Sequence, residues 1–150
     1  MPPASDLKTA TSGTAANTAD MRMPAGATGV LTIDLDAIVA NWRKLESHAV
    51  PADCAAVVKA DAYGCGITQV TRALARAGCR TFFVATLDEA RAAREVTPTS
   101  AIYVLDGFFP GSGDQFAKID CRPVIGDATE LAEWDAFRKT SGWEGQAAIH

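Results

Sequence analysis

The strongest chemical signal in this sequence is a single lysine at the end of a hydrophobic run. Residues 55–58 are Ala-Ala-Val-Val, Lys59 follows, and a turn of small residues then carries Tyr63 before two glycines. Glycine lets the backbone approach a bound molecule closely. The neutral amine of a lysine condenses with aldehydes to give a Schiff base. The spacing therefore predicts that Lys59 is held beside a bound aldehyde cofactor such as pyridoxal phosphate.

Short β-favouring runs alternate with helical patterns on both sides of this lysine. In the helical segments, apolar residues repeat at helical spacing after capping residues and stop at glycine or proline. From these signals we expect strands at 30–35, 55–59, 81–85, 101–105, 123–125 and 146–149. We expect helices after caps at Asp36 and Asp127, from Thr68 to Ala77, from Asp88 to Val96 and around 115–118, with a loop at 107–113.

The alternation is typical of βαβ units and predicts an α/β fold with a parallel sheet. The doubly wound fold and the eight-stranded barrel both fit, but no G-x-G-x-x-G follows the first strand, which disfavours the dinucleotide-binding form of the doubly wound fold. Barrel enzymes also keep their chemistry at the carboxyl ends of strands, where Lys59 lies. Because a closed barrel takes about 250 residues, we expect an incomplete (β/α)8 TIM-type barrel of roughly the first five or six βα units.

The expected barrel portion covers residues 30–150. Residues 1–29 are dominated by Ala, Thr, Ser, Gly and Pro and have few large apolar side chains. Such a segment buries too little apolar surface to offset the entropy of ordering, so we expect a disordered tail.

Composition excludes several other classes of protein. The chain has 150 residues and a formal net charge of −4, and it lacks the basic stripe typical of nucleic-acid binding. No apolar run approaches the roughly eighteen residues of a membrane span, and residues 1–23 have no apolar block typical of a secretory signal. The cysteines at 54, 65, 79 and 121 form no C-x-x-C pair. We therefore expect reduced thiols, no metal site and a cytoplasmic protein.

Residues 57–66 also carry a resemblance to a known family. They read V-V-K-A-D-A-Y-G-C-G and match, at all but one place, the hallmark V-V-K-A-[ND]-A-Y-G-H-G. Weaker matches follow the family's order at 33–37, 85–90 and 102–105. From about residue 31 to residue 150 the chain resembles the N-terminal part of a bacterial alanine racemase, a pyridoxal-phosphate enzyme of fold type III.

The resemblance implies roles for three residues. Lys59 matches the lysine that binds pyridoxal phosphate as a Schiff base and handles the α-proton on one face of the substrate. Tyr63 matches a tyrosine that hydrogen-bonds the cofactor phosphate, and Leu105 matches a leucine that packs near the cofactor. The family interconverts L- and D-alanine for peptidoglycan synthesis, and it forms a head-to-tail homodimer in which a β-rich domain follows the barrel.

The resemblance also implies that part of the site lies elsewhere. The family takes its second acid/base, a tyrosine, from the partner subunit, and its phosphate-binding loop comes later in the chain. We therefore expect an N-terminal fragment that does not racemise alanine alone. Cys65 stands where the family usually has histidine, and we expect this change to alter contacts within the glycine loop.

Two alternatives to an enzyme portion stay open. The chain would be a non-catalytic pyridoxal-phosphate-binding protein, of the kind that serves cofactor homeostasis, if it bound the cofactor without turnover. It would be the inert product of a truncated gene if it took up no cofactor at all. The residues that would separate alanine from serine as substrate are not among those matched.

Overall fold

The computed structural model describes residues 28–150. The tail predicted at 1–29 therefore lies almost wholly outside the described residues and stays a prediction. Ile33–His150 form one compact unit. Its elements, in chain order, are α1 (Leu35–Ala49), β1 (Ala56–Val57), α2 (Lys59–Tyr63), α3 (Ile67–Ala77), β2 (Thr81–Val84), α4 (Leu87–Val96), β3 (Ala101–Val104), α5 (Gly113–Ile119), β4 (Arg122–Ile125), α6 (Ala128–Ser141) and β5 (Ala148–Ile149).

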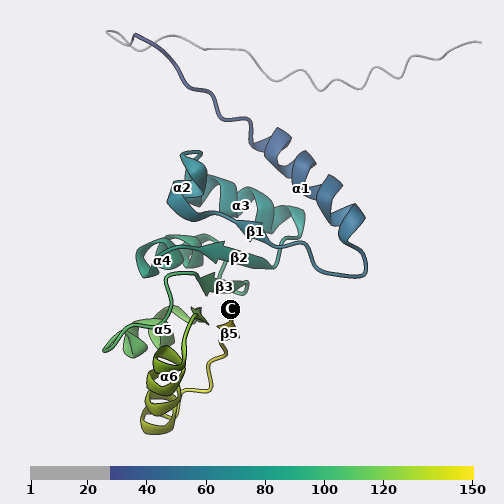
Figure 1. Ribbon diagram of the computed structural model, residues 1–150. Helices are drawn as coiled ribbons and strands as arrows, with labels where there is room; N and C mark the ends of the chain where they lie inside the picture. Colours follow the sequence, from purple (N-terminus) through teal and green to yellow (C-terminus); the bar gives the residue numbers. More distant parts are fainter. Residues whose placement is uncertain (1–27) are drawn as a thin grey trace, which may run out of the picture. The chain divides into compact units, whose positions relative to one another are not determined.

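The five strands form one parallel sheet in which spatial order equals chain order, β1-β2-β3-β4-β5 (Figure 1). A doubly wound sheet would contain a point at which the strand order reverses. No such reversal occurs between β1 and β5. Sequential parallel strands that alternate with helices are the arrangement of a barrel wall.

One face of the sheet is buried beneath the helices. Burial alternates along β2, β3 and β4, because successive strand side chains point to opposite faces. Phe82, Val84, Ile102 and Val104 lie on the buried face and are at most 1% exposed. They join side chains of α3, α4 and α5 in a single hydrophobic cluster. This cluster is the core of the described unit.

The opposite face is only partly covered, and we call it the open face. It carries Val57, Phe83, Tyr103, Arg122 and Val124, the residues that alternate with the buried ones. Val57 is 46% exposed, whereas the other four are half-buried. In a closed eight-stranded barrel the corresponding face is the packed interior.

Most helix predictions are confirmed, because capping and periodicity are local properties. Thr86 Oγ1 accepts from the Glu89 N–H at 3.3 Å and starts α4, and Asp127 caps α6 as predicted. Gly78, with φ of 116°, ends α3 in the left-handed conformation that glycine adopts without strain. Among residues 28–150, no helix is long and apolar enough to cross a membrane.

The prediction for the first elements was wrong. Residues 30–34 form no strand, and the expected strand at 30–35 runs into α1 at Leu35. The helix cap is Asp34, whose Oδ1 accepts from the Ala37 N–H at 2.9 Å, rather than Asp36. Both aspartates suit a cap, and Asp34 takes this place because its own backbone is extended. α1 is tied down by Trp42, which is 7% exposed and donates from Nε1 to the Cys54 carbonyl at 3.1 Å.

Arg94 ties several turns together at the amino end of the sheet. Its guanidinium donates to the carbonyls of Ser100 at 2.8 Å, Thr97 at 3.0 Å and Ile119 at 2.9 Å, and also to the carbonyl of Asp120. The planar fork of arginine supplies several donors at fixed angles. One side chain thereby holds the carboxyl ends of α4 and α5 against the start of β3.

Candidate active site

Lys59 stands at the carboxyl end of β1, where the backbone reverses its handedness. The predicted strand at 55–59 is shorter in the structure: only Ala56–Val57 pair as a strand, and Val58 adds one more bond, from its N–H to the Phe83 carbonyl at 2.8 Å. The residues from Ala60 to Tyr63 then have φ between 52° and 55°. The strand therefore delivers the lysine directly into a left-handed turn.

This turn is costly for the residues that form it. A left-handed conformation costs an L-residue about 1–2 kcal/mol, and four consecutive non-glycine residues adopt it here. Backbone bonds within the turn offset part of the cost: Ala62 N–H donates to Val58 O and Gly64 N–H donates to Ala60 O, both at 2.9 Å. Ala62 is also 6% exposed and belongs to the core.

Asp61 joins the turn to the following helix. Its Oδ1 accepts from the Ile67 N–H at 2.7 Å, and its carbonyl accepts from the Gly66 N–H at 2.9 Å. Gly66 has no side chain with which to cap α3, so Asp61 supplies the acceptor from five residues further back. This explains why α3 begins at Ile67, one residue before the predicted Thr68.

Glu89 reaches this turn from α4 and was missed by the sequence analysis. Its Oε2 accepts from the Ala85 N–H at 2.8 Å, and its Oε1 accepts from the Asp61 N–H at 3.3 Å. The signal that would have drawn attention to Glu89 is the Thr-x-x-Glu capping pattern at 86–89. That pattern predicts a role at the start of α4, but not the contact with residue 61.

Lys59 and Leu105 each follow a strand of the same sheet at its carboxyl end. Val57 pairs with Phe83 and Phe83 with Tyr103, and Lys59 and Leu105 come two residues after the first and last of these paired positions along the chain. Leu105 N–H still donates to Val84 O at 2.9 Å, which keeps the register to this point. The strands that precede them, β1 and β3, are two strand spacings apart, roughly 10 Å. Leu105 is 38% exposed and Lys59 half-buried.

Tyr63 occupies the last position of the left-handed turn. Its side chain is 65% exposed, so its hydroxyl is accessible to a bound molecule. The backbone thus places all three predicted site residues at the carboxyl end of the sheet: Lys59 and Tyr63 after β1, and Leu105 after β3.

The open face also carries a row of aromatic and cationic side chains that the sequence analysis missed. The Phe83 and Tyr103 rings stack with centroids 5.0 Å apart. Arg122 donates from Nη1 to the Tyr103 hydroxyl at 2.8 Å, and its Cζ lies 5.3 Å from the Tyr103 ring centroid. The row continues from Val57 across the sheet, because Val57 pairs with Phe83, Phe83 with Tyr103 and Tyr103 with Arg122. No local sequence signal links these residues, because they meet only through strand register.

The two deeply buried cysteines are poor candidates for chemistry. Burial raises the pKa of the Cys121 thiol from 9.0 to about 12, and it also raises the pKa of Cys79. A thiol is nucleophilic as its thiolate, so both groups are unreactive near neutral pH. Cys65 is half-buried within the glycine loop.

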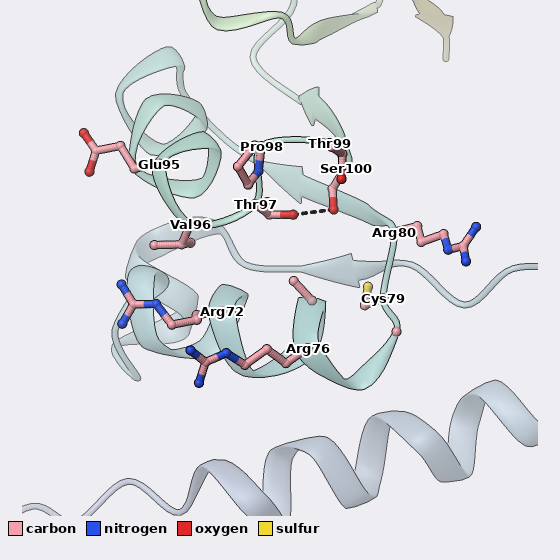
Figure 2. A pocket seen from close by; sticks show the side chains of 12 residues that line it. Arg72, Arg76, Cys79, Arg80, Glu95, Val96, Thr97, Pro98, Thr99 and Ser100 are labelled. Atoms are coloured by element: carbon pink, nitrogen blue, oxygen red, sulfur yellow. Dashed lines mark hydrogen bonds between the residues drawn. The ribbon is translucent and has the colours of Figure 1, made fainter.

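A broad cleft of about 890 Å³ lies at the other end of the sheet (Figure 2). It is lined by the carboxyl ends of α3 and α4 and by the segments that precede β2 and β3. Its arginines do not converge: in Figure 2, Arg72 and Arg76 extend to one side and Arg80 extends to the other. In barrels, the amino end of the strands serves stability and the carboxyl end carries the chemistry. The candidate site is therefore the lysine end.

Comparison with known proteins identifies close relatives. The family model described as "Alanine racemase, N-terminal domain" matches residues 33–150. An alanine racemase of Methylobacterium nodulans is 54% identical over 120 residues, which cover 80% of this chain and 32% of that protein. A catabolic alanine racemase of Agrobacterium fabrum is 42% identical over 125 residues, which cover 83% of this chain and 32% of that protein.

A solved structure gives the same result for the fold. The alanine racemase of Bartonella henselae, described with covalently bound pyridoxal phosphate, matches with a TM-score of 0.73 and 38% identity, over 77% of this chain and 32% of that one. This match confirms the predicted α/β fold as part of a TIM-type barrel. The chain spans about a third of the length of each of these relatives.

Proposed function

The chain belongs to the alanine racemase family, whose N-terminal domain it matches, and from this membership we propose that it supplies the cofactor-binding lysine of an amino-acid racemase acting on alanine. The cofactor is pyridoxal phosphate, and Lys59 is the residue that binds its aldehyde carbon. The observation that carries the proposal is the position of Lys59: a half-buried amine at the carboxyl end of a barrel strand, inside a fixed left-handed turn.

The residues around Lys59 fit such a cofactor. A pyridine ring needs apolar surface, and Val57 and Leu105, which are 46% and 38% exposed, offer it at the carboxyl ends of β1 and β3. A phosphate needs donors, and the exposed Tyr63 hydroxyl supplies one. When bound, the cofactor acts as an electron sink that makes the α-proton of an amino acid acidic.

Each residue then has its own task at the site. The Lys59 Nζ removes or returns a proton on one face of the substrate's α-carbon. Leu105 and Val57 exclude water from the side of the open face. The Tyr63 hydroxyl would donate a hydrogen bond to a phosphate oxygen and so help to hold the cofactor phosphate.

Racemisation also needs a proton donor on the opposite face of the α-carbon. Among residues 28–150 we assign no group to that task. We propose that the second acid/base and further phosphate contacts come from parts of the full-length enzyme outside the matched third, within a homodimer. The whole assembly would supply D-alanine for the cell wall.

Reductive trapping tests the proposal. The chain is incubated with pyridoxal phosphate, reduced with borohydride and digested, and the modified lysine is located by mass spectrometry. We expect the pyridoxyl group on Lys59, no such product from Lys59→Ala, and full labelling in the control Lys118→Ala, because Lys118 is exposed on α5. Alanine turnover is expected to be undetectable in the same samples.

One result would count against the role of Lys59, and another against the proposal that the second acid/base lies elsewhere. Labelling spread evenly over the lysines would mean that Lys59 is an ordinary surface amine. Labelling of Lys59 together with turnover by the chain alone would show that a second acid/base lies within these 150 residues.

A further inference from the structure

We infer that Glu89 is a positioning residue for Lys59: its carboxylate holds the left-handed turn that presents the amine. The inference rests on the proposed function in so far as Lys59 is the cofactor-binding group. Glu89 itself lies on α4, beyond β2, and is thirty residues further along the chain than the lysine. It acts through the backbone of Asp61.

The geometry of Glu89 places one carboxylate between two strand ends. Oε2 accepts from the Ala85 N–H at 2.8 Å, directly after β2. Oε1 accepts from the Asp61 N–H at 3.3 Å, two residues after Lys59. The bond to Ala85 is partly buried, whereas the bond to Asp61 lies at the exposed edge of the turn. The carboxylate thus links the end of the lysine strand to the end of its neighbour.

The turn needs an acceptor from outside, because its own backbone hydrogen bonds leave the Asp61 N–H without a backbone acceptor. In any helical turn the first N–H groups have no partner inside the turn. Ala62 N–H reaches Val58 O and Gly64 N–H reaches Ala60 O, whereas Asp61 N–H is satisfied by Glu89. Strained backbone persists only where its surroundings over-determine it. Loss of Glu89 would let residues 60–63 populate ordinary right-handed or extended conformations, which aim Lys59 elsewhere.

A second glutamate of the same chain provides a matched comparison. Glu130 stands three residues after its helix cap, as Glu89 does, and its Oε2 accepts from the Gly126 N–H at 2.9 Å. It also faces the turn after the neighbouring strand, because a Cβ added at Gly107 would lie 2.5 Å from its Oε1. The two glutamates therefore share their place at the start of a helix, but only Glu89 bonds the turn that follows Lys59.

The test compares Glu89→Ala with Glu130→Ala in the full chain without cofactor. Amide hydrogen exchange is measured for residues 60–66 and for the rest of the chain. Removing the charged acceptor of the Asp61 N–H is expected to speed exchange at Asp61 and its neighbours about tenfold. Glu130→Ala is expected to leave these amides unchanged and to speed exchange near Gly126 instead. Glu89→Gln, which keeps one acceptor oxygen, is expected to fall between wild type and Glu89→Ala.

The second readout is the rate at which borohydride traps pyridoxal phosphate on Lys59. We expect Glu89→Ala to trap about tenfold more slowly, Glu89→Gln to recover part of the rate, and Glu130→Ala to match wild type. Equal rates of amide exchange at residues 60–66 in Glu89→Ala and Glu130→Ala would overturn the inference. Equal trapping rates in all variants would overturn it as well. If the unsubstituted chain traps nothing, the proposed function fails, and amide exchange alone then decides whether Glu89 holds the turn. Should Glu89→Ala fail to fold, the comparison is made with Glu89→Gln against Glu130→Gln.

Discussion

Lys59 differs from the other described lysines by its location rather than by its chemistry. Lys44, Lys118 and Lys139 are exposed on helices, and Lys139 pairs with Asp135 at 2.5 Å. Lys59 is half-buried at a strand end, and a turn fixed by the backbone follows it. An amine whose backbone is already ordered loses less entropy when it binds a cofactor. At the scale of single residues, the surroundings of a lysine therefore distinguish a binding-site candidate from an ordinary surface charge.

Cys121 leads to a prediction about stability at high pH. Its side chain is fully buried, and burial raises its pKa from 9.0 to about 12. Between these two values the unfolded chain loses the thiol proton while the folded chain keeps it. Ionisation of the thiol therefore does not affect stability below pH 9.0. Above that value the free energy of unfolding falls as pH rises, by at most about 1.4 kcal/mol per pH unit.

Urea unfolding at a series of pH values above 9, under reducing conditions, measures this loss. Cys121→Ala has no thiol to ionise, so we expect its free energy of unfolding to fall less steeply with pH than that of wild type. Parallel pH dependences in the two proteins would show that ionisation of Cys121 contributes nothing.

At the scale of elements, replacing alanine by glycine should have opposite effects on stability in the left-handed turn and in a right-handed helix. Ala60 is exposed with φ of 52° in the left-handed turn, and Ala132 is exposed within the right-handed helix α6. An L-residue is strained in the left-handed conformation, whereas glycine is not. In a right-handed helix, glycine is instead less favourable than alanine.

We therefore expect Ala60→Gly to raise the free energy of unfolding by about 1 kcal/mol. Ala132→Gly is expected to lower it by about 1 kcal/mol. Denaturant unfolding of the two variants beside wild type measures both effects. A loss of stability in Ala60→Gly equal to that in Ala132→Gly would contradict a left-handed turn at residue 60.

At the scale of the whole described unit, the main asymmetry lies between the two faces of the sheet. The buried face packs against α3, α4 and α5, and its largest side chains are almost fully buried. The open face keeps Val57 46% exposed and carries the Phe83–Tyr103–Arg122 row. The matched region is about a third of the length of these relatives.

Replacing valine by threonine on each face tests this asymmetry with one chemical change. Val84→Thr puts a hydroxyl at a position with 0% exposure, and we expect a loss of about 2 kcal/mol because a buried hydroxyl without a partner is costly. Val57→Thr puts the same hydroxyl on the open face, and we expect a change within about 0.5 kcal/mol. Equal losses in urea unfolding would mean that the open face is covered in solution.

The order of helices and strands could be predicted because its signals are local. Caps at Thr86 and Asp127 and the glycine at 78 all act within one turn of the chain. The left-handed turn could not be predicted, because Ala60, Asp61 and Ala62 carry no glycine signal for positive φ. Their conformation is over-determined by contacts that include the distant Glu89.

The sequence by itself predicted Lys59 as the reactive residue and determined which class of fold would carry it. A lysine after a hydrophobic run, the motif around it and the βα alternation are all written along the chain. Only the tertiary structure decided that Lys59 and Leu105 follow strands of one sheet, that Tyr103 meets Arg122 and that Glu89 reaches Asp61. The physical reason is that these contacts depend on strand register. The alternating pattern of a strand indicates which of its residues face the core, but it does not say which residues of other strands and helices lie beside them.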